Sequence, residues 1–232
     1  GKGGGIRIFN GSNPELINVA INSNSATEQG GGISIEGLPG NSINLDFDRL
    51  TVQKNTSATV GGGIYLYISK LNLSRVFLME NSASTKGGGI SIEWDSDLTI
   101  VNSFILGNTL TAGEQGSSIY IGKSDQIIGS TEKLQAININ VVDTVSSNIS
   151  MYSNGLIKPL LINSINVGKL DAAVPTYNFD LNYSYCDDCT NLLTFTTNSG
   201  NLTGDLPFID MDKDNFELTD DSPLLSAATL SF

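Results

Sequence analysis

A glycine-rich hexapeptide recurs through the first half of the chain and constrains the fold more than any other feature. Gly87-Gly-Gly-Ile-Ser-Ile92 has counterparts at 3–8, 30–35, 61–66 and, with serines at two glycine positions, 116–121. The isoleucines that begin the apolar part of each copy lie 27, 31, 26 and 29 residues apart: Ile6, Ile33, Ile64, Ile90 and Ile119. Self-similarity at this period predicts a stack of similar coils. The glycines then serve close backbone approach, because neighbouring coils lie ~4.8 Å apart.

Each repeat has three parts, and two of them have the pattern of a β-strand. In the first part, aliphatic residues alternate with variable ones, as in Ile33-Ser-Ile35, and this period of two is typical of a strand. A polar turn follows, and then a strand pair with two apolar columns that align between repeats: Leu16/Phe47/Leu73/Ile100 and Ile21/Val52/Leu78/Ile105. The pattern predicts an all-β chain folded as a parallel β-helix, a solenoid of about seven to eight coils.

An asparagine ends each of the first four repeats. Asn24, Asn55, Asn81 and Asn108 each follow the second apolar column by three residues. Asparagine accepts left-handed backbone geometry, and stacked amide side chains can hydrogen-bond from rung to rung. We therefore expect an asparagine ladder turned into the stack, with a surface turn as the alternative.

The repeats divide a single predicted domain, residues 1–232, into three parts. Residues 1–121 form the regular coils, 122–200 form irregular coils, and 201–232 form a C-terminal coil or cap. Within the irregular part, further strands are expected at 134–142, 156–167 and 177–185, where apolar residues alternate with polar ones or cluster. The first repeat begins almost at the first residue with no polar cap, so we expect more chain or a partner in front of it.

Composition excludes several classes of function. Asp and Glu number 24 against 12 Lys and Arg, a net charge of -12 that repels nucleic acid. Histidine is absent and only two cysteines exist, which excludes a serine-histidine-acid triad and a Cys/His zinc site. No apolar run approaches the ~18 residues of a transmembrane helix.

Two segments carry a resemblance to a known family. Asn24-Ser-Ala-Thr-Glu-Gln-Gly-Gly-Gly-Ile33 and Asn81-Ser-Ala-Ser-Thr-Lys-Gly-Gly-Gly-Ile90 resemble the FxxN and GGAI repeats of polymorphic outer-membrane proteins. The likeness spans about residues 1–121, with an aliphatic residue at the Phe position and Gly at the Ala position. It implies a right-handed parallel β-helix that acts as a surface adhesin.

The end of the chain carries a second resemblance. The segments 201–210, 215–218 and 222–226 are similar to the GDPLF, NFxL and SPAID succession that ends secreted bacterial right-handed β-helix proteins, with Ser226 in place of the usual Asp. This likeness implies a terminal coil of the same fold.

The same region contains a candidate calcium loop. Asp210, Asp212 and Asp214 stand at alternate positions, and Asp221 occupies the twelfth position of a loop with the spacing of an EF-hand. The sixth position is Asn215 in place of the usual glycine, and no flanking helices are predicted. The alternative is a solvated acidic turn without metal.

A candidate binding face lies between the inward isoleucines of the first strand. We expect Arg7, Ser34, Tyr65, Ser91 and Tyr120 to point outward beside a second column, Phe9, Glu36, Tyr67 and Glu93. Tyr65, Tyr67 and Tyr120 would offer ring faces to a sugar, while Glu36 and Glu93 would accept hydrogen bonds from its hydroxyls. The alternative, which the sequence favours, is ordinary strand composition, since tyrosine is common in strands.

Glu36 and Glu93 also define the enzymatic alternative. They lie two rungs apart, roughly 9.6 Å, near the upper end of the carboxylate separation in inverting glycosidases. The column lacks the dense carboxylate cluster and basic residues usual for enzymes of this fold, so the sequence favours a protein that is not an enzyme.

Cys186 and Cys189 form a Cys-x-x-Cys pair without the strand-then-helix setting of a redox motif. A local disulfide in an oxidising compartment is the favoured interpretation, with free thiols or a redox role as alternatives.

Taken together, these features predict an extracellular or cell-surface module, adhesin-like or structural, that binds a glycan or a surface protein through its lateral faces. The alternative function is a polysaccharide-degrading enzyme.

Overall fold

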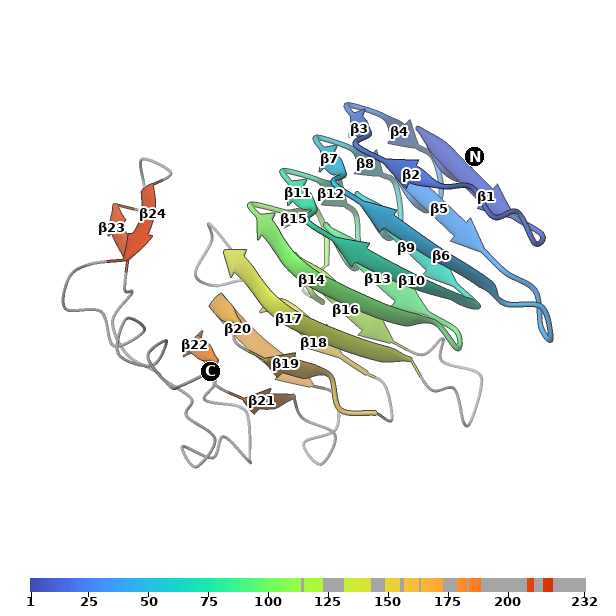
Figure 1. Ribbon diagram of the computed structural model, residues 1–232. Helices are drawn as coiled ribbons and strands as arrows, with labels where there is room; N and C mark the ends of the chain where they lie inside the picture. Colours follow the sequence, from blue (N-terminus) through green and yellow to red (C-terminus); the bar gives the residue numbers. More distant parts are fainter. Residues whose placement is uncertain are drawn as a thin grey trace.

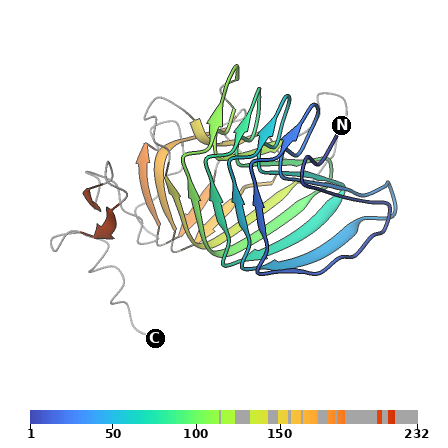
Figure 2. The same ribbon diagram turned by 90° about the horizontal axis from the view of Figure 1, so that it is seen from above.

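The computed structural model describes residues 1–113, 115–122, 132–142, 149–154, 157–162, 164–172, 179–182, 184–188, 208–210 and 215–218. Within these ranges every helix or strand assignment is a strand, and all strands except the last two stack in parallel along one axis (Figure 1). Seen from above, successive coils follow closely similar paths (Figure 2). The predicted fold class, a parallel β-solenoid, is confirmed. The right-handed winding and the number of coils stay predictions.

Strands from successive coils line up in four columns, which we call the first to fourth faces. The first face contains β1 (Ile6–Phe9), β5 (Ile33–Glu36), β9 (Ile64–Tyr67), β13 (Ile90–Glu93), β16 (Ile119–Gly122) and β18 (Ile149–Ser153). The second face contains β2 (Leu16–Ile17), β6 (Ile43–Asp48), β10 (Ser69–Ser74), the first half of β14 (Asp97–Leu106) and of β17 (Lys133–Val142), β19 (Leu160–Ile162) and β21 (Asp180–Asn182).

The third face contains β3 (Ala20–Asn22), β7 (Thr51–Gln53), β11 (Phe77–Met79), the second halves of β14 and β17, the start of β20 (Ile165–Ala172), and β22 (Tyr185–Asp188). The fourth face contains four two-residue strands, β4 (Ser25–Ala26), β8 (Thr56–Ser57), β12 (Ser82–Ala83) and β15 (Thr109–Leu110). The strands expected near 134–142, 156–167 and 177–185 correspond to β17, to β19 with β20, and to β21 with β22.

The core is a set of aliphatic ladders, as the aligned columns predicted. Ile33 pairs with Ile64, which pairs with Ile90, and all three side chains are fully buried. The column that runs from Leu16 through Phe47 and the column that includes Val52 and Leu78 also pair in register and line the interior. Burial of each aliphatic side chain contributes about 1.5–3 kcal/mol to the stability of the folded state.

The glycine triplets are required because the coils approach closely. At the second glycine of the third repeat, Gly62, a Cβ would lie 2.3 Å from the carbonyl oxygens of Gly88 and Ser82 in the next coil. The first glycine, Gly61, has φ of +65°, which favours glycine for a different reason. Serines replace the second and third glycines at 117 and 118, where the chain continues into the less regular coils.

The predicted asparagine ladder is confirmed. The side-chain amide of Asn24 donates to Oδ1 of Asn55, Asn55 donates to Asn81, and Asn81 donates to Asn108, each at 3.0 Å. The backbone N–H of each donor residue bonds the same oxygen. The expectation that asparagine itself takes left-handed geometry is wrong. The residue before it does so, namely Ser23, Lys54, Glu80 and Gly107, because the corner must turn before the amide can point into the stack.

The described part of the C-terminal segment is an antiparallel strand pair, and the expected coil or cap over 201–232 stays a prediction. β23 (Phe208–Asp210) and β24 (Asn215–Leu218) pair antiparallel with each other, whereas a further coil would pair in parallel. They form a separate two-stranded sheet.

Candidate functional site

The predicted binding column on the first face is paired in register, but most of it is covered. Ser34, Tyr65, Ser91 and Tyr120 pair on neighbouring strands, and all four are buried, with Tyr65 4% and Tyr120 1% exposed. The expectation that these tyrosine ring faces are open to solvent is wrong. Both tyrosines pair in register with Ser91, whose small side chain leaves room for the two rings on either side of it.

Aromatic and basic neighbours complete this cover. The rings of Tyr65 and Tyr67 stack with centroids 6.4 Å apart, and Tyr120 stacks on Tyr152 at 5.9 Å. Lys86 Nζ lies 4.7 Å from the Tyr120 ring centroid and donates to its hydroxyl at 3.2 Å. Tyr67, which also contacts Trp94 at 5.5 Å, stays half-buried and is the predicted aromatic residue with an accessible part.

Glu36 lies on the second strand of the first face, beside Phe9 of β1, in a basic setting. Lys2 donates to it at 2.7 Å, Arg7 at 3.1 Å and the Ser34 hydroxyl at 3.0 Å. Burial raises the pKa of this carboxyl, but the hydrogen bonds from Lys2, Ser34 and Arg7 outweigh burial and hold its pKa below the ordinary value. Glu36 is therefore ionised and paired.

Glu93 occupies the equivalent position two rungs along, with Tyr67 between the two glutamates in register. The Ser91 hydroxyl donates to it at 3.0 Å, as Ser34 does to Glu36. Burial raises the pKa of Glu93 above its ordinary value, because the hydrogen bonds from Ser91 and Tyr65 and the charge of Lys86 compensate only in part. The negative charge of Glu132, which is fully buried, adds to the increase.

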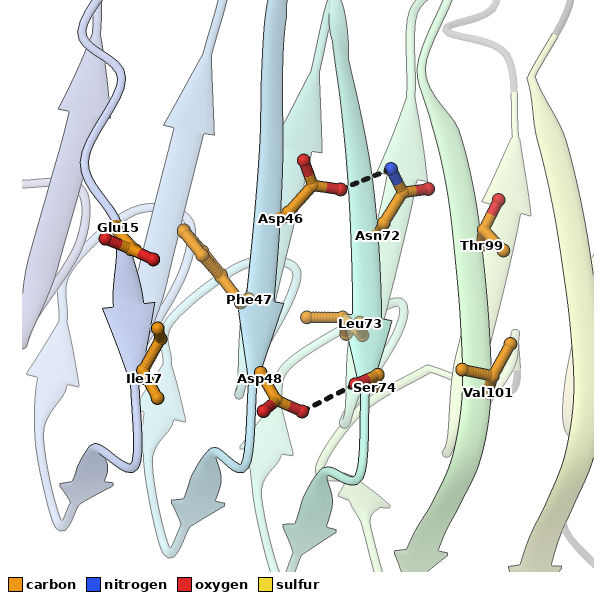
Figure 3. A pocket seen from close by; sticks show the side chains of 10 residues that line it. All are labelled: Glu15, Ile17, Asp46, Phe47, Asp48, Asn72, Leu73, Ser74, Thr99 and Val101. Carbon is orange, nitrogen blue, oxygen red and sulfur yellow. Dashed lines mark hydrogen bonds between the residues drawn. The ribbon is translucent and has the colours of Figure 1, made fainter.

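A groove on the second face was not predicted (Figure 3). It has a volume of about 320 Å³ and crosses β2, β6, β10 and β14. Two rows of outward side chains line it, one residue from each rung. The Glu15 row contains Glu15, Asp46, Asn72 and Thr99, and the Ile17 row contains Ile17, Asp48, Ser74 and Val101.

Hydrogen bonds within the rows fix the carboxylates. Asn72 donates its amide to Asp46 at 2.7 Å, and the Ser74 hydroxyl donates to Asp48 at 2.6 Å. Arg75 bonds Asp48 at 2.5 Å and Arg49 lies 2.9 Å from it. The hydrogen bond from Arg75, then that from Ser74, holds the pKa of Asp48 below its ordinary value.

The groove therefore combines carboxylate, amide and hydroxyl groups with aliphatic side chains at opposite ends of one row, Ile17 and Val101. Between the rows lie the inward residues Phe47 and Leu73, both buried. The sequence contained a signal for it, because the residue before each member of the aligned core column Phe47/Leu73/Ile100 is polar in three successive repeats: Asp46, Asn72 and Thr99. Outward polar residues are normal in strands, so alternation alone did not distinguish this site from an ordinary surface.

The remaining predicted sites lie partly outside the described residues. Asp210 belongs to β23, whereas Asp212 and Asp214 fall beyond the described ranges. Among the residues that the structure describes, no three Asp, Glu, His or Cys side chains gather as a metal site would require. Cys186 is fully buried and disulfide-bonded, while Cys189 lies outside the described residues.

The described residues include no helix long and apolar enough to cross a membrane. Comparisons of the chain with protein-family models, with curated proteins and with solved structures found no match.

Proposed function

We propose that the protein is a carbohydrate-binding β-solenoid, adhesin-like and placed outside the cell or on its surface, and that its glycan lies in the groove of the second face. The observation that carries this proposal is the groove itself, in which three carboxylates, an amide and two hydroxyls line a cavity of about 320 Å³. Sugar recognition needs such acceptors for hydroxyl groups, together with some apolar surface for the C–H groups.

Separate features support the proposed location outside the cell or on its surface. The repeats of the regular coils resemble those of surface adhesins, and a disulfide at Cys186 suits an oxidising compartment. The net charge of -12 favours a partner that is not itself a polyanion. A surface protein remains the second kind of partner for the same face.

A glycan array tests the proposal. We expect the protein to bind one group of glycans, and the double variant Asp46→Ala/Asn72→Ala to lose that binding, because it removes the hydrogen-bonded pair in the groove. Asn44→Ala is the matched control, since Asn44 is an exposed residue on the same strand and is not among the groove residues. An array without any bound glycan, or a double variant that binds like the parent protein, would overturn the proposal.

A second candidate function, polysaccharide hydrolysis, is favoured by one observation. Glu36 and Glu93 have pKa values shifted in opposite directions, and such a pair can supply a general base and a general acid. Release of reducing ends from a polysaccharide panel, abolished in Glu93→Gln, would support hydrolysis. If no product forms from any polysaccharide that the protein binds, hydrolysis is rejected and carbohydrate binding is the only remaining function of the two.

A further inference from the structure

We infer that the groove binds an uncharged linear glycan that lies along the solenoid axis, with about one sugar unit for each rung. This inference rests on the proposed function and specifies its ligand. It concerns two properties that the array alone does not measure, the direction of the bound chain and its charge.

The direction follows from the arrangement of the rows. Asp46 pairs in register with Asn72, which pairs with Thr99, so each rung presents a polar side chain at the same level. These side chains repeat along the axis at the rung spacing of ~4.8 Å, which is close to the length of one sugar unit in an extended chain. A glycan that crosses the strands therefore meets a new acceptor at each unit (Figure 3).

A chain that ran along a single strand would meet a less favourable surface. On β10, for example, the outward groove residues are Asn72 and Ser74 only, and beyond Ser74 the chain turns at Arg75, which has φ of +54°. The polar row across the rungs is longer, because it extends from Glu15 to Thr99. The groove is thus a row of similar subsites and not a single deep pocket.

The charge of the ligand follows from the carboxylate side chains of the groove. A carboxylate is a hydrogen-bond acceptor only, so Glu15, Asp46 and Asp48 select donors, and Glu15 and Asp46 repel sugar carboxylates or sulfates. An ammonium group has less to gain, because Asp46 already accepts from Asn72, and Asp48 is paired with Arg75 and Arg49. Uncharged hydroxyl groups suit this surface better. They can donate hydrogen bonds to these carboxylates and accept one from the second amide N–H of Asn72.

Isothermal titration tests the direction. The probes are oligosaccharides of one to six units of β-1,4-linked glucose, β-1,4-linked mannose and β-1,3-linked glucose. We expect the affinity for the preferred series to rise several-fold with each added unit until the chain spans the four rungs, and then to level off. Full affinity for a monosaccharide, or binding that does not change with length, would overturn the axial arrangement.

The charge is tested with the same oligosaccharides oxidised at C6 to uronates. The parent protein should bind them at least about tenfold more weakly than the neutral chains, because like charges meet in the groove. Glu15→Gln/Asp46→Asn should reduce this discrimination, while Asn44→Ala should keep it. Equal binding of neutral and oxidised chains by the parent protein, or an unchanged ratio in the double variant, would overturn the inferred ligand class.

The outcomes separate this inference from the proposed function. Glycan binding that depends on Asp46 and Asn72, but not on chain length or charge, would retain the proposed function and overturn the inference. Absence of binding to all three neutral series and to the array would overturn both.

Discussion

The coil that contains Glu36 and the coil that contains Glu93 present the same tetrapeptide, Ile-Ser-Ile-Glu, on the same face. Both glutamates accept a hydrogen bond from the serine two residues before them at 3.0 Å. Yet the pKa of Glu36 is lowered and that of Glu93 is raised. The difference comes from neighbours on adjacent rungs, Lys2 and Arg7 for Glu36 and a buried surrounding with Glu132 for Glu93. In this solenoid, the local sequence determines the position of a side chain, and residues about one repeat away determine its chemistry.

The largest expected loss of stability comes from a substitution in β9, the strand that lies between the strands of the two glutamates. Ile64→Asp should abolish folding of both coils, because an unpaired charge would replace a fully buried side chain in the ladder. A loss of more than about 4 kcal/mol of unfolding free energy is expected, measured by denaturant titration. The control Ile64→Val should cost only about 0.5–1.5 kcal/mol. An Ile64→Asp protein as stable as the parent would place this residue outside the core.

The next effect compares the ladder asparagines of the two coils. Asn108→Ala leaves the side-chain and backbone donors of fully buried Asn81 without their acceptor, whereas Asn55→Ala does the same to half-buried Asn24. Each buried orphaned group costs about 1–3 kcal/mol. We expect Asn108→Ala to lower the melting temperature more than Asn55→Ala. The reverse order would show that the two coils bury their ladders differently from the structure.

The smallest effect is the pH dependence of stability. The pKa of Glu36 is lowered on folding, so its contribution is present above the ordinary glutamate pKa and is lost as pH falls through the folded value. Glu36→Gln should therefore destabilise the protein at neutral pH, by about 1 kcal/mol or less because the pair is partly exposed, and should have little effect at strongly acidic pH.

Glu93 should behave in the opposite sense. Its raised pKa means that its contribution is present below the ordinary glutamate pKa and is lost as pH rises through the folded value. We therefore expect the stability of Glu93→Gln, measured relative to the parent protein, to be higher at neutral pH than at acidic pH. Urea unfolding of both variants across this range checks the signs, and parallel pH profiles would contradict the comparison.

Prediction from the sequence succeeded where the repeat itself imposes the geometry. The spacing of Ile33, Ile64 and Ile90 was sufficient to predict the core ladder, and the position of Asn55 predicted the amide ladder, because both point inward in every coil. Outward positions vary between coils, so their exposure depends on the size of the side chains one rung away. This is why Tyr65 and Tyr120 were expected to be open but are buried.

The groove was missed for a related reason. Asp46 and Asn72 are 26 residues apart in sequence, and nothing in either repeat alone indicates that they bond each other. Only the register of β6 and β10 brings them together. When the repeats are aligned, Asp46, Asn72 and Thr99 fall in one outward column, as the inward residues do in theirs.

The central claim is that neighbours on adjacent rungs determine the chemistry of equivalent residues in the repeat. An NMR titration that follows the side-chain carboxyl carbons of Glu36 and Glu93 in the same protein tests it most directly. Glu36 should titrate below and Glu93 above an ordinary glutamate, and Glu36 should move toward the ordinary value in Lys2→Ala/Arg7→Ala. Two glutamates that titrate together, or a Glu36 that does not respond to the loss of Lys2 and Arg7, would contradict the claim.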